Sequence, residues 1–76
     1  MKQVCANGNV EYRNSNGKLH RTDGPAIEHA NVNDYKTWYI NGERLADMID
    51  GEIIILTEGE LPLSIKQSIA MEKLKA

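Results

Sequence analysis

This chain of 76 residues has a single cysteine, no phenylalanine, two prolines and no long apolar run. Because Cys5 has no intrachain partner and a free thiol fits a reducing compartment, we expect a cytoplasmic protein. Cys5 with His20 and His29 cannot complete a tetrahedral zinc site without carboxylates, so we predict no metal site. The longest apolar run, 53–56, is too short to span a membrane, and the N-terminal segment lacks the apolar core of a signal peptide.

The chain also lacks a large excess of either charge, because its net charge is −2 and acidic and basic residues are mixed along it. Nucleic-acid binding works through a basic face, so this balance argues against a nucleic-acid partner. The charge is uneven, since residues 1–36 sum to +1 and residues 37–76 sum to −3. Between Glu43 and Glu60, six acidic residues accompany Arg44 alone, which indicates either a local acidic patch or an ordinary solvated surface.

The chain is long enough for one domain, residues 1–76, and a domain of this size buries only ~60% of the surface that its unfolded form exposes. Within it we distinguish a β-hairpin region over 8–45 from a tail over 46–76. In the hairpin region, apolar and polar residues alternate in short segments, which is typical of half-buried strands. These segments lie at 10–13, around Leu19, at 26–29 and at 35–40, with a polar loop over 30–34.

Two dipeptides that favour turns separate these segments. Asn16-Gly17 and Asn41-Gly42 predict hairpin turns of type I′, in which both central residues need positive φ. The segment 35–40 has the strongest strand composition, and its alternation directs Trp38 to the core and Tyr39 to the opposite face. The region therefore predicts an antiparallel meander.

After Gly42 the pattern changes. Leu45, Met48 and Ile49 recur at helical spacing, and Gly51 suits the position after a helix. We therefore predict a short helix over 44–50, with the return strand of the preceding hairpin over 43–45 as the alternative. The apolar run predicts a strand over 53–57 that is covered on both faces or pairs at an interface.

A C-terminal helix is predicted over 65–75, because Ser64 and Gln67 have the spacing of a capping box. Its apolar residues form two groups, Leu63, Ala70, Met71 and Leu74 on one side and Ile65 and Ile69 on the other. Since a surface helix normally has one apolar face, two groups indicate one contact with the sheet and another with something else. A misplaced helix start is the alternative.

The sequence thus predicts an α+β fold, a small antiparallel β-meander of three to five strands built from hairpin repeats, with a C-terminal α-helix. The run from Asn16 to Glu28, followed by WYING at 38–42, resembles the "NGKLHRxDGPA … WYxNG" repeats of small MORN-like β-hairpin repeat proteins of bacteriophages and bacteria. The resemblance covers about residues 10–45, and the chain departs from it in having fewer than two repeats and in its tail. It implies protein binding, since bacterial relatives include antitoxin-like proteins and phage members would bind host proteins.

His20, Arg21 and Asp23 form a compact polar group, followed by Gly24 and Pro25. One hypothesis makes it catalytic, with histidine as base and arginine on an anion. We favour a structural role in the turn, because no nucleophile can be placed beside it. The glycines of the chain are isolated turn residues, so no phosphate loop and no cofactor are predicted.

We therefore predict a non-enzymatic protein-binding module, a phage-type protein that binds and inhibits or redirects a host protein by steric occlusion or charge mimicry. A self-associating structural module, such as a homodimer, and an antitoxin-like binder of a toxin are the alternatives. The residues predicted to contact the partner are exposed tyrosines, acidic residues and one side of the helix: Tyr35, Tyr39, Asp47, Asp50, Glu52, Ile65 and Ile69.

Overall fold

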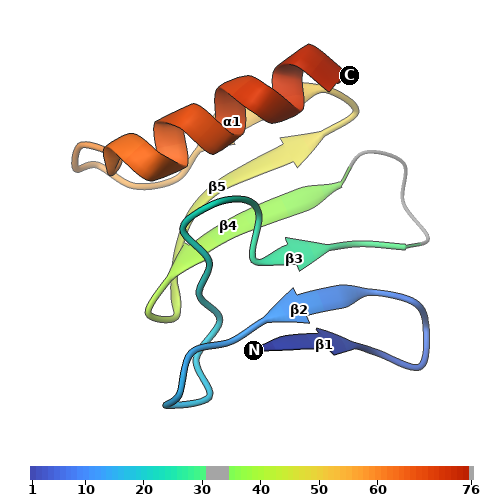
Figure 1. Cartoon of the computed structure of the whole chain (residues 1–76). Helices are drawn as coiled ribbons and strands as arrows, with labels where there is room; N and C mark the ends of the chain where they lie inside the picture. Colours follow the sequence, from blue (N-terminus) through green and yellow to red (C-terminus); the bar gives the residue numbers. More distant parts are fainter. Residues whose placement is uncertain (31–34, 76) are drawn as a thin grey trace.

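The computed structural model describes residues 1–30 and 35–75 and contains one antiparallel sheet with a helix on one of its faces (Figure 1). Each strand pairs with the next along the chain, so the spatial order equals the sequence order. The elements are β1 (Lys2–Val4), β2 (Val10–Tyr12), β3 (Ile27–Glu28), β4 (Lys36–Ile40), β5 (Glu43–Ile49), β6 (Glu52–Ile55) and α1 (Leu63–Lys75). The predicted α+β meander with a C-terminal helix is confirmed, although the sheet has six strands.

The sheet has more strands than predicted because β1 and β5 were not expected, whereas β6 corresponds to the strand predicted over 53–57. β1 pairs with β2 although residues 1–7 show no strand periodicity, whereas the segment around Leu19 forms only a single bridge, to Arg13. The polar loop predicted over 30–34 falls, apart from Ala30, outside the described residues.

The hairpin turns follow from the backbone conformations of a few residues. Asn41 and Gly42 both have positive φ, 50° and 83°, as the predicted type I′ turn requires. At Asn16-Gly17 only the glycine has positive φ, and its N–H donates to the Asn14 carbonyl at 3.0 Å. That turn is therefore a type I turn followed by a left-handed glycine, and the type I′ prediction was wrong there.

The predicted helix over 44–50 is wrong, because these residues belong to β5. Asp50 and Gly51 have φ of 52° and 84°, which makes them a type I′ turn between β5 and β6 and not the end of a helix. Ile49 is exposed, so the helical spacing of the apolar residues does not correspond to a buried face. Pairing with strands on both sides decides the conformation of this seven-residue segment, over which the two periodicities are hard to distinguish.

A β-bulge in β5 fixes which residues face the helix. Trp38 pairs with Ala46 but Tyr39 pairs with Arg44, so Leu45 is an extra residue in β5. Leu45 and Ala46 are consecutive, yet both are buried in the core. Because one extra residue shifts the alternation, Arg44 lies on the face opposite the core.

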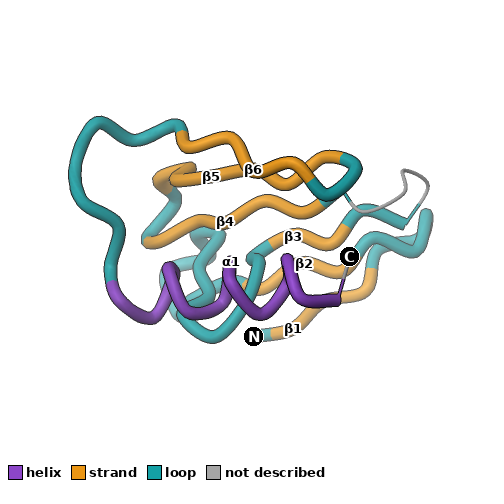
Figure 2. Tube along the Cα trace, turned by 90° about the horizontal axis from the view of Figure 1, so that it is seen from above, coloured by secondary structure: helices purple, strands orange, loops and turns teal. Residues whose placement is uncertain are grey.

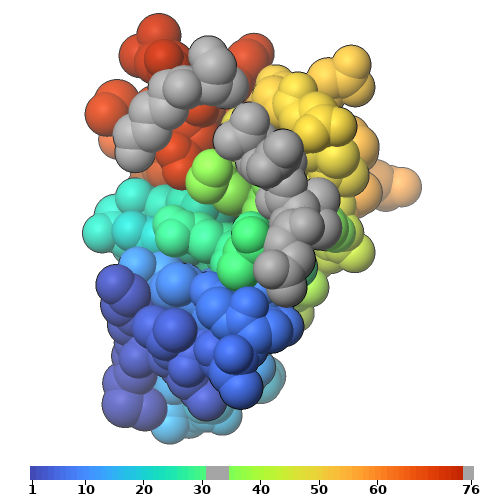
Figure 3. All heavy atoms as spheres, turned by 90° about the vertical axis from the view of Figure 1, so that its right-hand side faces the viewer, coloured from blue at the N-terminus to red at the C-terminus, as the bar shows by residue number. Residues whose placement is uncertain are grey.

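The core lies between α1 and the β4–β5 hairpin. Figure 2 shows α1 running in nearly the same direction as the strands, and Figure 3 shows the N-terminal segment and the helix at opposite ends of the molecule. The buried cluster is Trp38, Leu45, Ala46, Met48, Ile65 and Ile69, and it confirms the core position predicted for Trp38.

The start of α1 differs from the prediction. The Pro62 carbonyl accepts the N–H groups of Ile65 and Lys66, both at 3.0 Å, so Pro62 caps the helix and Ser64 lies inside the first turn. The capping box of Ser64 and Gln67 therefore does not mark the first residue of the helix.

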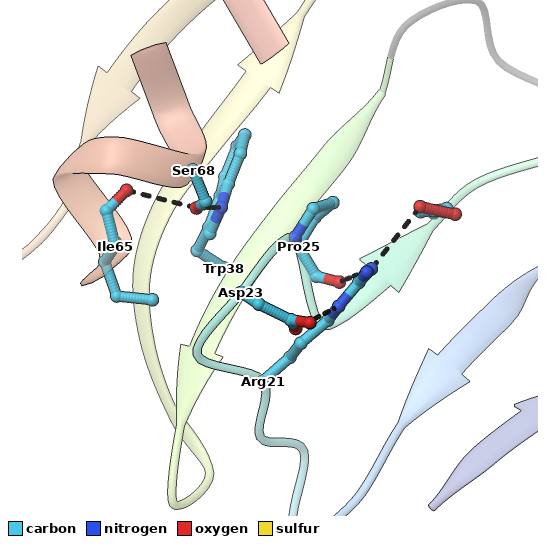
Figure 4. Close-up of polar contacts among 7 residues, drawn as sticks. Arg21, Asp23, Pro25, Trp38, Ile65 and Ser68 are labelled. Atoms are coloured by element: carbon cyan, nitrogen blue, oxygen red, sulfur yellow. Dashed lines mark hydrogen bonds and ion pairs between the residues drawn. The ribbon is translucent and has the colours of Figure 1, made fainter. Parts of the chain in front are cut away.

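One buried hydrogen bond joins the helix to the sheet. The Trp38 indole Nε1–H donates to the Ser68 Oγ at 2.7 Å, and the Ser68 hydroxyl donates to the Ile65 carbonyl at 3.1 Å (Figure 4). Trp38 is fully buried, so without the Ser68 hydroxyl its indole N–H would have no hydrogen-bond acceptor to replace water. The bond therefore fixes the position of α1 along β4.

We expect Ser68→Ala to lower the free energy of unfolding by about 1–3 kcal/mol, because it leaves the buried indole N–H without an acceptor. Ser64→Ala is the matched control, since Ser64 is exposed on the same helix. Urea unfolding monitored by tryptophan fluorescence measures both. In a Trp38→Phe background, which has no tryptophan and is therefore followed by far-UV circular dichroism, the effect of Ser68→Ala should shrink. An equal effect in both backgrounds, measured by circular dichroism, would show that the bond does not contribute.

Candidate functional site

The polar group at 20–25 forms a structural corner beside α1. Arg21 donates to the Asp23 carboxylate at 2.9 Å and to the Pro25 carbonyl at 3.2 Å, and lies 3.6 Å from the Glu28 carboxylate (Figure 4). Its guanidinium carbon lies 4.0 Å from the centre of the Tyr12 ring, a cation–π contact. A single side chain thus ties its own loop to β2 and β3.

Gly24 lets this arginine approach the backbone. A Cβ atom at position 24 would lie 2.6 Å from the guanidinium carbon of Arg21, which is closer than van der Waals contact allows. Gly24 and Pro25 are both buried, and the Ala26 N–H donates to the Thr37 carbonyl at 2.8 Å, where the chain enters β3. The sequence Asp-Gly-Pro is therefore explained by the packing of Arg21.

His20 connects the two hairpins. Its Nδ1 accepts the Asn41 N–H at 3.0 Å, and the Leu19 carbonyl accepts the Gly42 N–H at 2.8 Å. The Asn14 amide also donates to the Asn41 side chain at 3.1 Å. Asp23 pairs with Arg21 and does not orient the histidine, so the geometry favours the structural role predicted for this group over the catalytic one.

The sheet face opposite α1 contains the tyrosines predicted to contact a partner. We call the set Tyr35, Tyr39, Arg44, Ile49 and Ile54 the open face, because alternation and register direct these side chains away from the helix. The aliphatic members are 37% and 44% exposed, and the tyrosines are half-buried. Tyr35 also stacks on His29, with ring centroids 4.0 Å apart.

The bulge of β5 places Arg44 and Asp47 on the same face of the sheet, where they form an ion pair. In a regular strand Arg44 and Asp47 would point to opposite faces, whereas here Arg44 donates through Nε to the Asp47 carboxylate at 3.1 Å and makes a second hydrogen bond through Nη2. The Asp47 carboxylate raises the pKa of the Arg44 guanidinium above its usual range, and Tyr35 and Tyr39 contribute to the same direction. Tyr39 is the cross-strand partner of Arg44, and alternation along the chain places Tyr35 on the same face of the sheet.

Asp47 was assigned to an exposed acidic patch, and the structure corrects this assignment. Asp47 is 5% exposed and paired with Arg44, so it offers no free charge to a partner. Asp50 and Glu52 are exposed at the β5–β6 turn, as a surface role requires. Only the outer part of the predicted patch is therefore at the surface.

Ile65 and Ile69 were assigned to the partner-binding side of the helix, and this is also corrected. They are 0% and 8% exposed because they pack on Trp38 in the core. The apolar residues of the other side point to solvent, with Leu63 70%, Met71 58% and Leu74 83% exposed. The helix does have two apolar sides, but the two were interchanged in the prediction.

Other candidate chemistry is sparse within residues 1–30 and 35–75. No group of three or more His, Cys, Asp or Glu is placed there to hold a metal ion, and no helix there is long and apolar enough to cross a membrane. Burial and the neighbouring Glu11 raise the pKa of the Cys5 thiol, which keeps it protonated and weakly nucleophilic. An open cavity of about 420 Å³ lies at the β4–β5 turn, and its lining includes the apolar Ile40 and Leu45 and the acidic Glu43 and Glu60.

Comparison with known proteins finds no family model, no curated protein and no solved structure that matches this chain. The resemblance to MORN-like repeat proteins therefore remains a prediction from the motif alone.

The Arg21–Asp23 pair predicts a pH dependence. Arg21 lowers the pKa of the Asp23 carboxyl, so the pair stabilises the fold above the ordinary aspartate pKa of about 3.9 and loses its contribution as the pH falls through the lower folded value. Asp23→Asn should therefore lower the urea midpoint at pH 7 and have a smaller effect at pH 2, where the carboxylate begins to lose its charge in the folded state as well. The difference should be small and reduced by salt, because the carboxylate is 82% exposed. An equal difference at both pH values would contradict the role of the pair.

Proposed function

We propose that this protein is a non-enzymatic protein-binding module that uses the open face of its sheet to bind a partner. The observation that carries the proposal is the composition of that face, where Tyr35 and Tyr39 share the face with Arg44, the cross-strand partner of Tyr39, and Asp47 anchors the arginine. Tyrosine and arginine are the residues most enriched at energetic centres of interfaces. α1 packs on the other face of the sheet, against the cluster that contains Trp38.

Preorganisation supports the proposal as well. Asp47 holds Arg44 by two hydrogen bonds, and the Tyr35 ring is stacked on His29, so these side chains have lost part of their rotamer freedom before any partner arrives. Ordering each flexible side chain on binding would otherwise cost about 0.5–1.5 kcal/mol. A partner would present an acceptor to Arg44 and an apolar group to the tyrosines.

In the setting that the repeat motif implies, we propose a cytoplasmic phage-type protein whose partner is a host protein that it inhibits or redirects by steric occlusion. Occlusion is preferred over charge mimicry because Asp47, at the centre of the acidic segment, is neutralised by Arg44. The binding of a toxin, as by an antitoxin, would use the same surface.

The test is retention of a protein from bacterial extract on the immobilised chain, followed by measurement of its affinity with purified components. Tyr39→Ala should weaken the binding by roughly 30-fold, about 2 kcal/mol, as expected of a central interface residue. Leu74→Ser is the matched control, because this apolar residue is exposed on the opposite side of the molecule. A partner whose affinity falls with Leu74→Ser and not with Tyr39→Ala would refute the open face as the binding surface.

A further inference from the structure

The two edges of the sheet differ in what they offer to another strand. Every edge strand presents backbone N–H and C=O groups that can pair with a further chain, and proteins commonly block such pairing with lysine, proline or very short strands. β1 has three residues and carries Lys2. β6 continues from Glu52 through Ile53, Ile54 and Ile55 into Leu56, with no lysine, arginine or proline. The edge formed by β6 therefore lacks the usual protection.

The apolar side chains of this edge are exposed to an unusual degree for a small domain. Ile54, Ile55 and Leu56 are 44%, 50% and 46% exposed. Figure 2 shows β6 as the outermost strand at the top of the view and α1 along the bottom. Nothing among the described residues covers this side of β6.

The hydrogen-bond alternation shows which backbone groups of β6 point outward. The Leu56 N–H donates to the Leu45 carbonyl at 2.9 Å, in register with the pairing of Ile54 to Asp47. Since antiparallel strands alternate residues that bond inward and outward, Ile53 and Ile55 direct their N–H and C=O groups away from β5. The edge thus offers two donors and two acceptors in alternation.

This arrangement is self-complementary. We propose that two copies of the chain pair antiparallel through β6 about a twofold axis at Ile54, which joins their sheets into one of twelve strands. In this register Ile53 of each copy bonds Ile55 of the other, forming four backbone hydrogen bonds, and the two Ile54 side chains meet at the axis. Of the residues of the open face the proposal uses only Ile54, which lies at the edge, so a loss of partner binding with Tyr39→Ala does not bear on it.

Charge selects this orientation. Antiparallel pairing places each Glu52 opposite Leu56 of the second copy, so the two Glu52 residues lie about 13 Å apart at 3.3 Å per residue. Parallel pairing in register would place the two carboxylates side by side and is disfavoured by their repulsion. On the helix side of the sheet, the half-exposed Ile55 would gain Ile53 of the second copy as a neighbour, extending the core across the seam.

The interface is small, since a strand of four residues buries less than a standard interface, so the dimer should depend on concentration. Sedimentation velocity of the full chain across about 5–500 µM, a range suited to weak association, should show a shift from monomer to dimer. Ile54→Lys should remove the dimer, because it places two ammonium groups together at the axis. Val4→Lys is the matched control, since Val4 is 65% exposed on the opposite edge and its substitution should leave the dimer unchanged.

A disulfide tests the register even if the lysine variant fails to fold. Residues that face each other in a pair without mutual hydrogen bonds have Cα atoms ~4.5 Å apart, which is within disulfide range. In a Cys5→Ser background, Ile54→Cys should form a covalent dimer on mild oxidation and Val4→Cys should not. A wild-type chain that stays monomeric at 500 µM would overturn the proposal. This holds also if the β6 edge is then found to pair with a different protein. A dimer that persists in Ile54→Lys would overturn it as well.

Discussion

The burial of Trp38 is the constraint on which the rest of this structure depends. It is the only tryptophan of a chain without phenylalanine, and it contacts both the sheet and α1. Its N–H needs a buried acceptor, which Ser68 provides, and this bond sets the position of the helix over β4. The bulge opposite Trp38 then places Leu45 and Ala46 in the core and directs Arg44 to the other face. The core on one face and the proposed binding surface on the other therefore have one geometric origin.

The parts of the fold that the sequence predicted are those determined by local chemistry. Asn41-Gly42 needs left-handed backbone, the aromatic and β-branched residues of β4 favour a strand, and a tryptophan in so small a domain must be inside. The arginine corner was predicted as structural for a similar reason, since Asp-Gly-Pro is a turn and Arg21 has carboxylates close by in sequence. Each of these inferences uses residues within a few positions of one another.

The parts that were missed depend on contacts distant in sequence. The segment 44–50 has helical spacing by itself, and only its neighbours β4 and β6 make it a strand. The dipeptide Asp50-Gly51 was a hairpin signal that could have corrected the prediction. The bulge, which no local pattern announces, moves Arg44 next to Asp47 and removes Asp47 from the acidic surface. Which apolar side of α1 faces inward was likewise decided by the position of Trp38, and so Ile65 and Ile69 are core residues.

The two edge strands differ, since β1 is short and carries a lysine, and we propose that only β6 pairs with a second copy of the chain. Amide hydrogen exchange of the wild-type chain, measured residue by residue at 10 µM and at 500 µM, tests it most directly. The Ile53 and Ile55 amides should exchange at least about tenfold more slowly at the higher concentration, because both become hydrogen-bonded between the two copies. The outward amides of β1, those of Lys2 and Val4, should exchange equally fast at both concentrations. Unchanged exchange at Ile53 and Ile55, or equal protection on both edges, would contradict it.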